Sequence, residues 1–497
     1  MTFAFKNKLQ KLILFHKFPL AIVNGVVNSI AGLITSISSI IGSILIVRFL
    51  NPDDYGELSY YLWIAGFLSM IISLNLPFTI TKVTSELRGA GEVDEVNLLT
   101  IKTSKFLLLF SLLVSVILLI FGLTTATDDI YKYLIIATIL IPTILSSLER
   151  SFLWGNQKYK FIAISNIVSS LLSLILIIIG YYFFYDLHWF IFANLSPSIF
   201  QLIMLSIYIG LPNLHHFKLL LTKIKLKKST KKLFINFAIP SAIYMLVEIV
   251  VTQRSEVFFI ERYREIAEVG YYSLAFTIYS LFLGVGLTLI HGFYPAISTD
   301  IGSNSREKVQ TKVNKGVIVS VIYAIPIIFG CIVIIDPIIR MLYGEKMIMT
   351  VPIIQLLILG LFPGMIVGIS GLLLSAIGGI WDRVIAGIIS VLVNIILSIL
   401  LIPNHGVLGA ALSNVISQLV NASLLYLIIM KKYKINYPWI QILVIAIIGL
   451  LVTGAFPYTL MILLPSTIGS IISIALAIIV FYMSLKKLKI WNYLSEE

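Results

Sequence analysis

The chain has 497 residues and a formal net charge of +13; 59% of its residues are hydrophobic and only 12% are charged. A water-soluble protein of this length needs charged residues at about a quarter of its positions. This composition, with a mean hydropathy of +1.02, therefore excludes a soluble fold and indicates an integral membrane protein. Its one cysteine, Cys331, excludes an intrachain disulfide.

Residues 1–19 are basic and amphipathic and predict a cytoplasmic segment lying in the membrane interface. The apolar runs that follow have the length of a membrane-crossing helix, about 20 residues. We count fourteen of them: 20–49, 57–80, 105–123, 133–153, 161–183, 188–211, 233–260, 268–292, 316–335, 349–377, 384–402, 407–430, 437–458 and 464–485. The predicted fold class is an all-α integral membrane protein with about 14 transmembrane helices.

These spans fall into two sets of six and a final pair. The first set occupies residues 20–211, and a basic cytoplasmic linker at 212–232 separates it from the second set at 233–430. Residues 431–497 hold the last two spans and a cytoplasmic tail. We expect the two sets to form six-helix lobes in a pseudo-twofold arrangement.

The Lys and Arg residues alternate with the loops. If the N-terminus is cytoplasmic, 29 of the 36 fall in cytoplasmic segments; the other seven are Arg48, Lys132, Arg254, Arg262, Arg264, Arg340 and Lys346. Cytoplasmic loops carry such an excess of basic residues, so both termini and the linker are predicted to be cytoplasmic. Because the lysines are spread over eight segments, we expect no nucleic-acid partner.

Two outer loops echo each other. Residues 48–61 and 262–275 each begin with an arginine and reach a glycine, Gly56 or Gly270, eight residues later, with an acid two positions before the glycine. The offset between the copies is 214 residues. The echo predicts that the two six-helix sets are parallel repeats, an architecture typical of transporters with a site between the halves.

Further motifs surround the second copy. Glu256 lies late in span 7 and is followed by Gly270, Tyr272 and Ala275, and span 12 opens with "PNHGVLGAALSNVISQ" at 403–418. Together with the order of fourteen spans, these motifs resemble the polysaccharide-flippase branch of the multidrug/oligosaccharidyl-lipid/polysaccharide (MOP) superfamily. The resemblance covers nearly the whole chain.

The resemblance implies a transporter, not an enzyme. It would flip a lipid-linked (polyprenyl pyrophosphate) oligosaccharide or polysaccharide repeat unit across the cytoplasmic membrane by alternating access. Two alternatives stay open: a cation-coupled multidrug antiporter, which the lack of an acid in span 1 disfavours, and a membrane polysaccharide polymerase or glycosyltransferase, which the short outer loops disfavour.

The expected partners are the lipid-linked substrate and membrane lipids, with H⁺ or Na⁺ left open as a coupling ion. We expect a monomer. The sequence has no nucleotide-binding phosphate loop and no cluster of metal ligands, so no cofactor, catalytic residue or metal site is predicted.

Polar residues inside or at the ends of spans are the candidates for the substrate site, because buried charge is costly and is retained for a function. They are Arg254, Glu256, Glu248, Arg48, Asn24, Asn28, Lys82, Glu149 and Arg150. Arg254 is the first choice for the pyrophosphate, because the planar guanidinium binds phosphate oxygens bidentately.

Simpler roles remain open for the same residues. Arg254 and Glu256 could form an ion pair between helices, and Glu248 could be a neutral carboxyl group. Arg48 could reach the outer interface and Lys82 could anchor a span at the inner surface. The Glu149–Arg150 and Asn24–Asn28 pairs could equally be structural.

Overall fold

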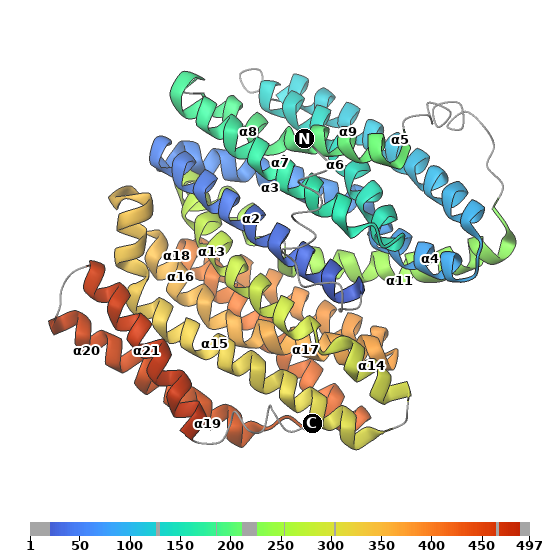
Figure 1. Cartoon of the computed structure of the whole chain (residues 1–497). Coiled ribbons are helices and arrows are strands. Elements are labelled where there is room, and N and C mark those ends of the chain that lie inside the picture. Colours follow the sequence, from blue (N-terminus) through green and yellow to red (C-terminus); the bar gives the residue numbers. More distant parts are fainter. Residues whose placement is uncertain are drawn as a thin grey trace, which may run out of the picture. The chain divides into compact units, whose positions relative to one another are not determined.

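The computed structural model describes residues 20–125, 130–184, 186–210, 226–252, 254–302, 305–463 and 467–487, and the side chains of residues 20–30 and 247–252 are among those left out. Within these ranges every regular element is a helix, as predicted (Figure 1). The predicted segment 1–19, most of the linker 212–232 and most of the tail lie outside the described residues.

The helices occupy the following residues: α2 Leu20–Phe49, α3 Pro52–Ser73, α4 Leu76–Gly89, α5 Val93–Thr125, α6 Ile130–Gly155, α7 Tyr159–Ile179, η2 Gly180–Phe184, α8 Leu187–Leu195, α9 Pro197–Gly210, α11 Lys228–Thr252, α12 Glu256–Tyr263, α13 Ile266–His291, α14 Tyr294–Gly302, α15 Arg306–Tyr343, η4 Glu345–Met347, α16 Thr350–Leu357, η5 Ile358–Gly360, α17 Leu361–Ile377, α18 Ile380–Ile428, η6 Ile429–Tyr433, α19 Trp439–Gly449, η7 Leu450–Ala455, α20 Phe456–Leu463 and α21 Thr467–Lys487.

The exposed faces of these helices suit lipid. On α5, Leu109, Leu113, Val116 and Ile120 are each at least 50% exposed, and their spacing of three to four residues places them on one face. In water such a stripe would be unfavourable, whereas a bilayer accommodates it. The chain is a multi-pass membrane protein.

Ten of the described helices are long and apolar enough to cross a membrane, or eleven if α3 and α4, bent by 43°, form one span. The difference from the fourteen predicted spans arises at three places. Span 7 and span 14 run over residues that are only partly described, and spans 11 and 12 are continuous as α18.

α18 nevertheless folds back on itself. In a straight helix, 27 residues would separate Ser390 from Ser417 by about 40 Å, yet the Ser390 hydroxyl donates to the Ser417 carbonyl at 2.6 Å. The reversal lies at Gly406, where φ is 53° and ψ is −138°, a conformation that glycine adopts readily. The two halves of α18 are therefore antiparallel helices packed side by side.

By their contacts, the described residues fall into two compact units. One comprises the described parts of Met1–Ile46 and Ala65–Ala242, and the other comprises Val47–Ile64 and the described parts of Ile243–Glu497. In the first unit α6 packs against α4, α5 and α9; in the second, α18 packs against α12, α13, α16 and α17, while α19 and α21 lie along α15. The loop 47–64, which the sequence assigns to the first lobe, thus packs within the second unit.

The echo between the outer loops is preserved in the helix boundaries. α12 ends and α13 begins 214 residues after the corresponding ends of α2 and α3, and Gly56 and Gly270 are each the fifth residue of their helix. The two glycines also touch: a Cβ atom on Gly270 would lie 3.0 Å from the Gly56 nitrogen. Their equivalent positions, which the sequence predicted, are therefore observed.

Candidate functional site

The helix predicted over 233–260 is interrupted. α11 ends at Thr252 and α12 begins at Glu256, so the prediction of one continuous helix was wrong. Between them Arg254 has a φ of 54°, a left-handed conformation that breaks the helical hydrogen-bond pattern and is uncommon outside glycine. The break places Glu256 in the first turn of α12, where the helix dipole favours a negative charge.

Glu256 is fully buried and is held by two amide groups. Its Oε1 accepts hydrogen bonds from the Nδ2 atoms of Asn394, at 2.7 Å, and Asn414, at 3.0 Å. These asparagines lie on opposite halves of α18, so the hairpin brings them to the same carboxylate. Sequence analysis did not select Asn394 or Asn414, although an amide within an otherwise apolar run was the signal that could have identified each.

The other oxygen of Glu256 is unsatisfied. Neither Oε2 nor the Tyr272 hydroxyl has a hydrogen-bond partner among the described residues, and both atoms are inaccessible to solvent. Tyr272, on α13, faces the same carboxylate. Unpaired buried polar atoms are costly, so this pair marks a place where a proton or another small cation could be accommodated.

The polar cluster continues away from the carboxylate. The Asn414 Oδ1 accepts from the Gln418 Nε2 at 2.6 Å, and the Gln418 Oε1 accepts from the Tyr279 hydroxyl at 2.8 Å. All of these side chains are at most 7% exposed. The segment 403–418, noted in the sequence as a motif, thus supplies Asn414 and Gln418 to the site.

Arg254 lies at the edge of this cluster and is half-buried. Among described contacts its Nη1 makes one long hydrogen bond, 3.5 Å to the Ser273 carbonyl, and its guanidinium lies 5.6 Å from the centre of the Phe276 ring. No ion pair joins it to Glu256 among the described residues. The side chain of Glu248, the third candidate in this region, lies outside the described residues.

Arg48 caps a neighbouring helix. Its Nε and Nη2 donate to the carbonyls of Leu342, at 2.8 Å, and Met341, at 2.5 Å, in the last turn of α15. In return Lys346 donates to the carbonyls of Arg48, at 2.9 Å, and Leu50. Each cation thus binds the carbonyl-rich end of the other segment's helix, which is the favourable end for positive charge, and desolvation there lowers the pKa of Lys346.

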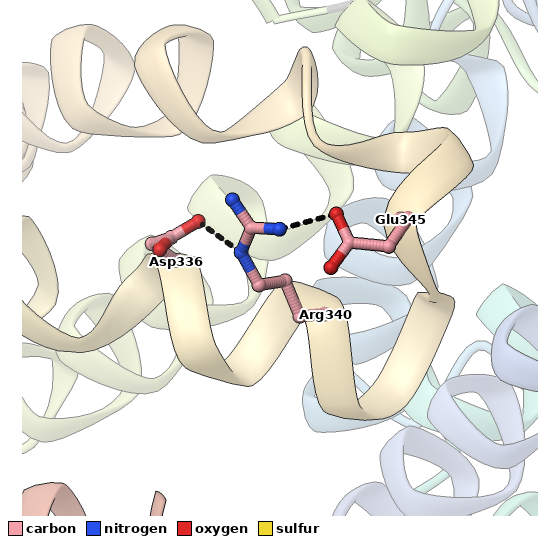
Figure 2. A network of polar contacts seen from close by, with 3 residues as sticks. All are labelled: Asp336, Arg340 and Glu345. Atoms are coloured by element: carbon pink, nitrogen blue, oxygen red, sulfur yellow. Dashed lines mark hydrogen bonds and ion pairs between the residues drawn. The ribbon is translucent and has the colours of Figure 1, made fainter. Parts of the chain in front are cut away.

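Arg340 is engaged close by. Its Nε binds Asp336 at 3.0 Å and its Nη1 binds Glu345, so the guanidinium is held between two acids (Figure 2). Arg48, Arg340 and Lys346 are three of the seven cations that the sequence assigns to the outer side. The structure gives each of them an intramolecular partner.

The remaining candidates lie in the first unit. Lys82 pairs with Glu86 at 3.7 Å and lies 4.0 Å from the centre of the Phe237 ring. Because its side chain is 44% exposed, this ion pair contributes little to stability.

Glu149, on α6, accepts a hydrogen bond from the Ser206 hydroxyl of α9 at 2.8 Å, and the neighbouring Arg150 is half-buried. The side chains of Asn24 and Asn28 lie outside the described residues. Of the nine candidates, the structure brings Arg254 and Glu256 to one polar cluster; Lys82, Glu149 and Arg150 belong to the other unit.

Comparison with known proteins identifies the family. Residues 22–301, more than half of the chain, match the profile described as polysaccharide biosynthesis protein. The chain belongs to the polysaccharide biosynthesis family. Residues 240–400 also match the MatE family, which places the chain in the MOP superfamily of transporters and confirms the predicted superfamily and the prediction that the protein is not an enzyme.

The chain is similar to individual proteins of related kinds, each at low identity. A probable low-salt glycan biosynthesis flippase, Agl15, from Haloferax volcanii is 24% identical over 158 residues; the match covers 32% of this chain and only 34% of that protein. Solved structures share the fold. The lipid II flippase MurJ, in an inward closed conformation, superposes with a TM-score of 0.66 at 18% identity, covering 93% of this chain and 99% of its own.

A multidrug resistance MATE family transporter, in an inward-facing conformation, superposes with a TM-score of 0.65 at 13% identity. The superposition covers 81% of this chain and 96% of the transporter. At these identities the likeness concerns the fold.

Proposed function

We propose that this protein flips a lipid-linked oligosaccharide or polysaccharide repeat unit across the cytoplasmic membrane by alternating access. Its family, the name of the Haloferax relative and a fold shared with a lipid II flippase all support this function. The observation that carries the proposal is the half-buried Arg254 at a helix break, which forms no ion pair with a described acid.

The chemistry of such a substrate explains what the chain must supply. A polyprenyl pyrophosphate carries negative charge that cannot enter hydrocarbon unpaired. A guanidinium offers several N–H donors in a plane and binds phosphate oxygens in pairs. The left-handed backbone at Arg254 leaves its donors outside the regular α11 and α12 helices, where a ligand could approach them.

Glu256 is proposed to couple transport to an ion. The carboxylate has two N–H donors on Oε1 and no described partner on Oε2. A proton on Oε2 would give the adjacent Tyr272 hydroxyl a donor, so protonation would satisfy both unpaired atoms. Of the two ions left open by the sequence, H⁺ and Na⁺, this geometry favours H⁺.

Substitution of Arg254 tests the substrate contact. In a host whose own copy of the gene is deleted, Arg254→Ala on a plasmid should lower surface polysaccharide about tenfold or more, because a hydrogen bond to a charged group contributes about 1.5–3 kcal/mol. Arg254→Lys should also be impaired, since it keeps the charge and loses the bidentate fork. Membrane levels and inner-leaflet lipid-linked intermediates should be measured together.

Arg262→Ala, at an exposed arginine of α12, is the matched control and should export normally. Normal export by Arg254→Ala would exclude the phosphate role. Recovery of export on adding Glu256→Ala would show that Arg254 serves as an ion-pair partner.

We further propose fourteen spans in two six-helix lobes plus two helices, in a monomer with both termini and the 212–232 linker in the cytoplasm. In intact cells, a membrane-impermeant maleimide should label a cysteine placed at Asp53 and leave one at Lys225 unlabelled until the cells are opened. Cys331 should first be replaced by serine. Labelling of position 225 in sealed cells would reverse the topology.

The second candidate is a multidrug antiporter, favoured by the MatE match over residues 240–400. The two functions differ in the deletion host. Loss of the gene should stop polysaccharide export if the substrate is a glycan lipid. It should instead raise sensitivity to cationic drugs if the substrate is a drug.

A further inference from the structure

Both amide groups at Glu256 have their oxygen atoms engaged elsewhere. The Asn394 Oδ1 accepts from the Ser255 hydroxyl at 3.2 Å, and the Asn414 Oδ1 accepts from the Gln418 Nε2 at 2.6 Å. An amide whose oxygen is occupied on one side must present its NH₂ group on the other. The described surroundings of Glu256 Oε1 are therefore N–H donors.

Gln418 is itself held in one orientation. Its Oε1 accepts from the Tyr279 hydroxyl at 2.8 Å, and that hydroxyl lies 3.4 Å from the Gly360 carbonyl. The pair fills a recess left by two glycines one turn apart, because a Cβ atom on Gly364 would lie 3.0 Å from the Gln418 Oε1 and 3.3 Å from the Tyr279 oxygen. A tyrosine hydroxyl, two amides and a carboxylate thus form one directed chain of hydrogen bonds.

This direction decides which ion the carboxylate can take. Hard cations are bound by oxygen ligands, with several required at once. Here the amide oxygens face away, so an alkali cation would find the Glu256 carboxylate and the Tyr272 hydroxyl without oxygen from Asn394 or Asn414. A proton needs one oxygen alone, and Glu256 Oε2 is free of a described partner.

We propose that Gln418, anchored by Tyr279, determines the ion selectivity of the Glu256 site by turning the Asn414 amide nitrogen toward the carboxylate, so that the site takes H⁺ and excludes Na⁺. The inference rests on the proposed coupling role of Glu256 and goes beyond it. Gln418 is a positioning residue, since it acts through Asn414. The titratable groups that face Glu256 are Arg254 and Tyr272; α18 presents the amide and hydroxyl groups of Asn394, Asn414 and Ser417.

Reversal of one amide tests the proposal. In Gln418→Glu the new carboxylate can only accept from Asn414, whose amide should turn and present its oxygen to Glu256. The full-length purified protein should be unfolded thermally at constant ionic strength while NaCl replaces KCl. We expect the wild type to respond to pH and to show no difference between the salts, and Gln418→Glu to gain Na⁺ affinity of about tenfold or more, visible as a rise in the unfolding midpoint with NaCl.

Two further variants keep the test decisive. Tyr279→Phe removes the anchoring hydroxyl with little change in shape, frees the Gln418 amide to turn, and should show a weaker Na⁺ response if Gln418→Glu does not accumulate. Gln355→Glu, at a half-buried glutamine whose amide donates to the Ile332 carbonyl, is the matched control and should behave as the wild type toward NaCl.

A wild-type protein already stabilised by NaCl over KCl would overturn the proposal, as would folded Gln418→Glu and Tyr279→Phe proteins that both ignore Na⁺. These outcomes differ from failure of the coupling role, which would appear as normal polysaccharide export by Glu256→Gln in the deletion host. A Na⁺ response in Gln418→Glu that disappears when Glu256→Gln is added would place the new ion at this carboxylate.

Discussion

Replacing Glu256 with glutamine should abolish polysaccharide export while the protein still reaches the membrane at normal levels. Glutamine keeps an oxygen that can accept from Asn394 and Asn414, and its amide can donate toward Tyr272, so the buried cluster stays satisfied. It cannot exchange a proton. Loss of a proton-transfer group commonly costs about 100-fold or more in rate, and we expect a loss of that size in export of labelled polysaccharide.

Glu256→Ala separates the two parts of this role. It leaves two buried amides without an acceptor, each at a cost of about 1–3 kcal/mol, so it should lower the thermal stability as well as export. Glu261→Ala, five residues later on α12, is the control and should leave both unchanged. Export by Glu256→Gln at the wild-type rate would rule out ion coupling through this residue.

A methyl group on Gly56 should prevent the protein from accumulating in the membrane. An ideal Cβ there would lie 2.0 Å from the Ile266 carbonyl oxygen and 2.7 Å from its carbon. These are backbone atoms at the start of α13, so relief requires movement of a helix rather than a side chain. Overpacking commonly costs about 1–3 kcal/mol, and this contact should cost at least that much for Gly56→Ala and more for Gly56→Val.

Gly284→Ala supplies the matched control. Gly284 lies within α13, and a Cβ atom at this position would meet no atom within 4 Å, so alanine should be tolerated or slightly stabilising. Fluorescence-detected size-exclusion of detergent extracts measures the amount of folded protein, and a temperature series measures its stability. Equal amounts of Gly56→Ala and Gly284→Ala would contradict the close packing of the two outer loops.

Much of the architecture follows from the sequence because its causes are local. A run of about 20 apolar residues is sufficient for a helix in lipid, and the helices observed fall on the predicted spans. The offset of 214 between two short loops also persisted as equal helix ends, since each loop carries its own helix-start and glycine signals. Glu256 was identified as a candidate for the same kind of reason: a charge within an apolar run is costly wherever the helix packs.

The tertiary structure decided what the charges do. Glu256 meets amides that are 138 and 158 residues away, and Arg48 meets the end of α15 nearly 300 residues away; neither pairing has a sequence period. The break at Arg254 contains no proline, and the turn at Gly406 lies within a continuous helical element, so neither was visible as an interruption. Helix propensity and hydropathy are properties of neighbouring residues, whereas the partner of a buried polar group depends on which helices pack together.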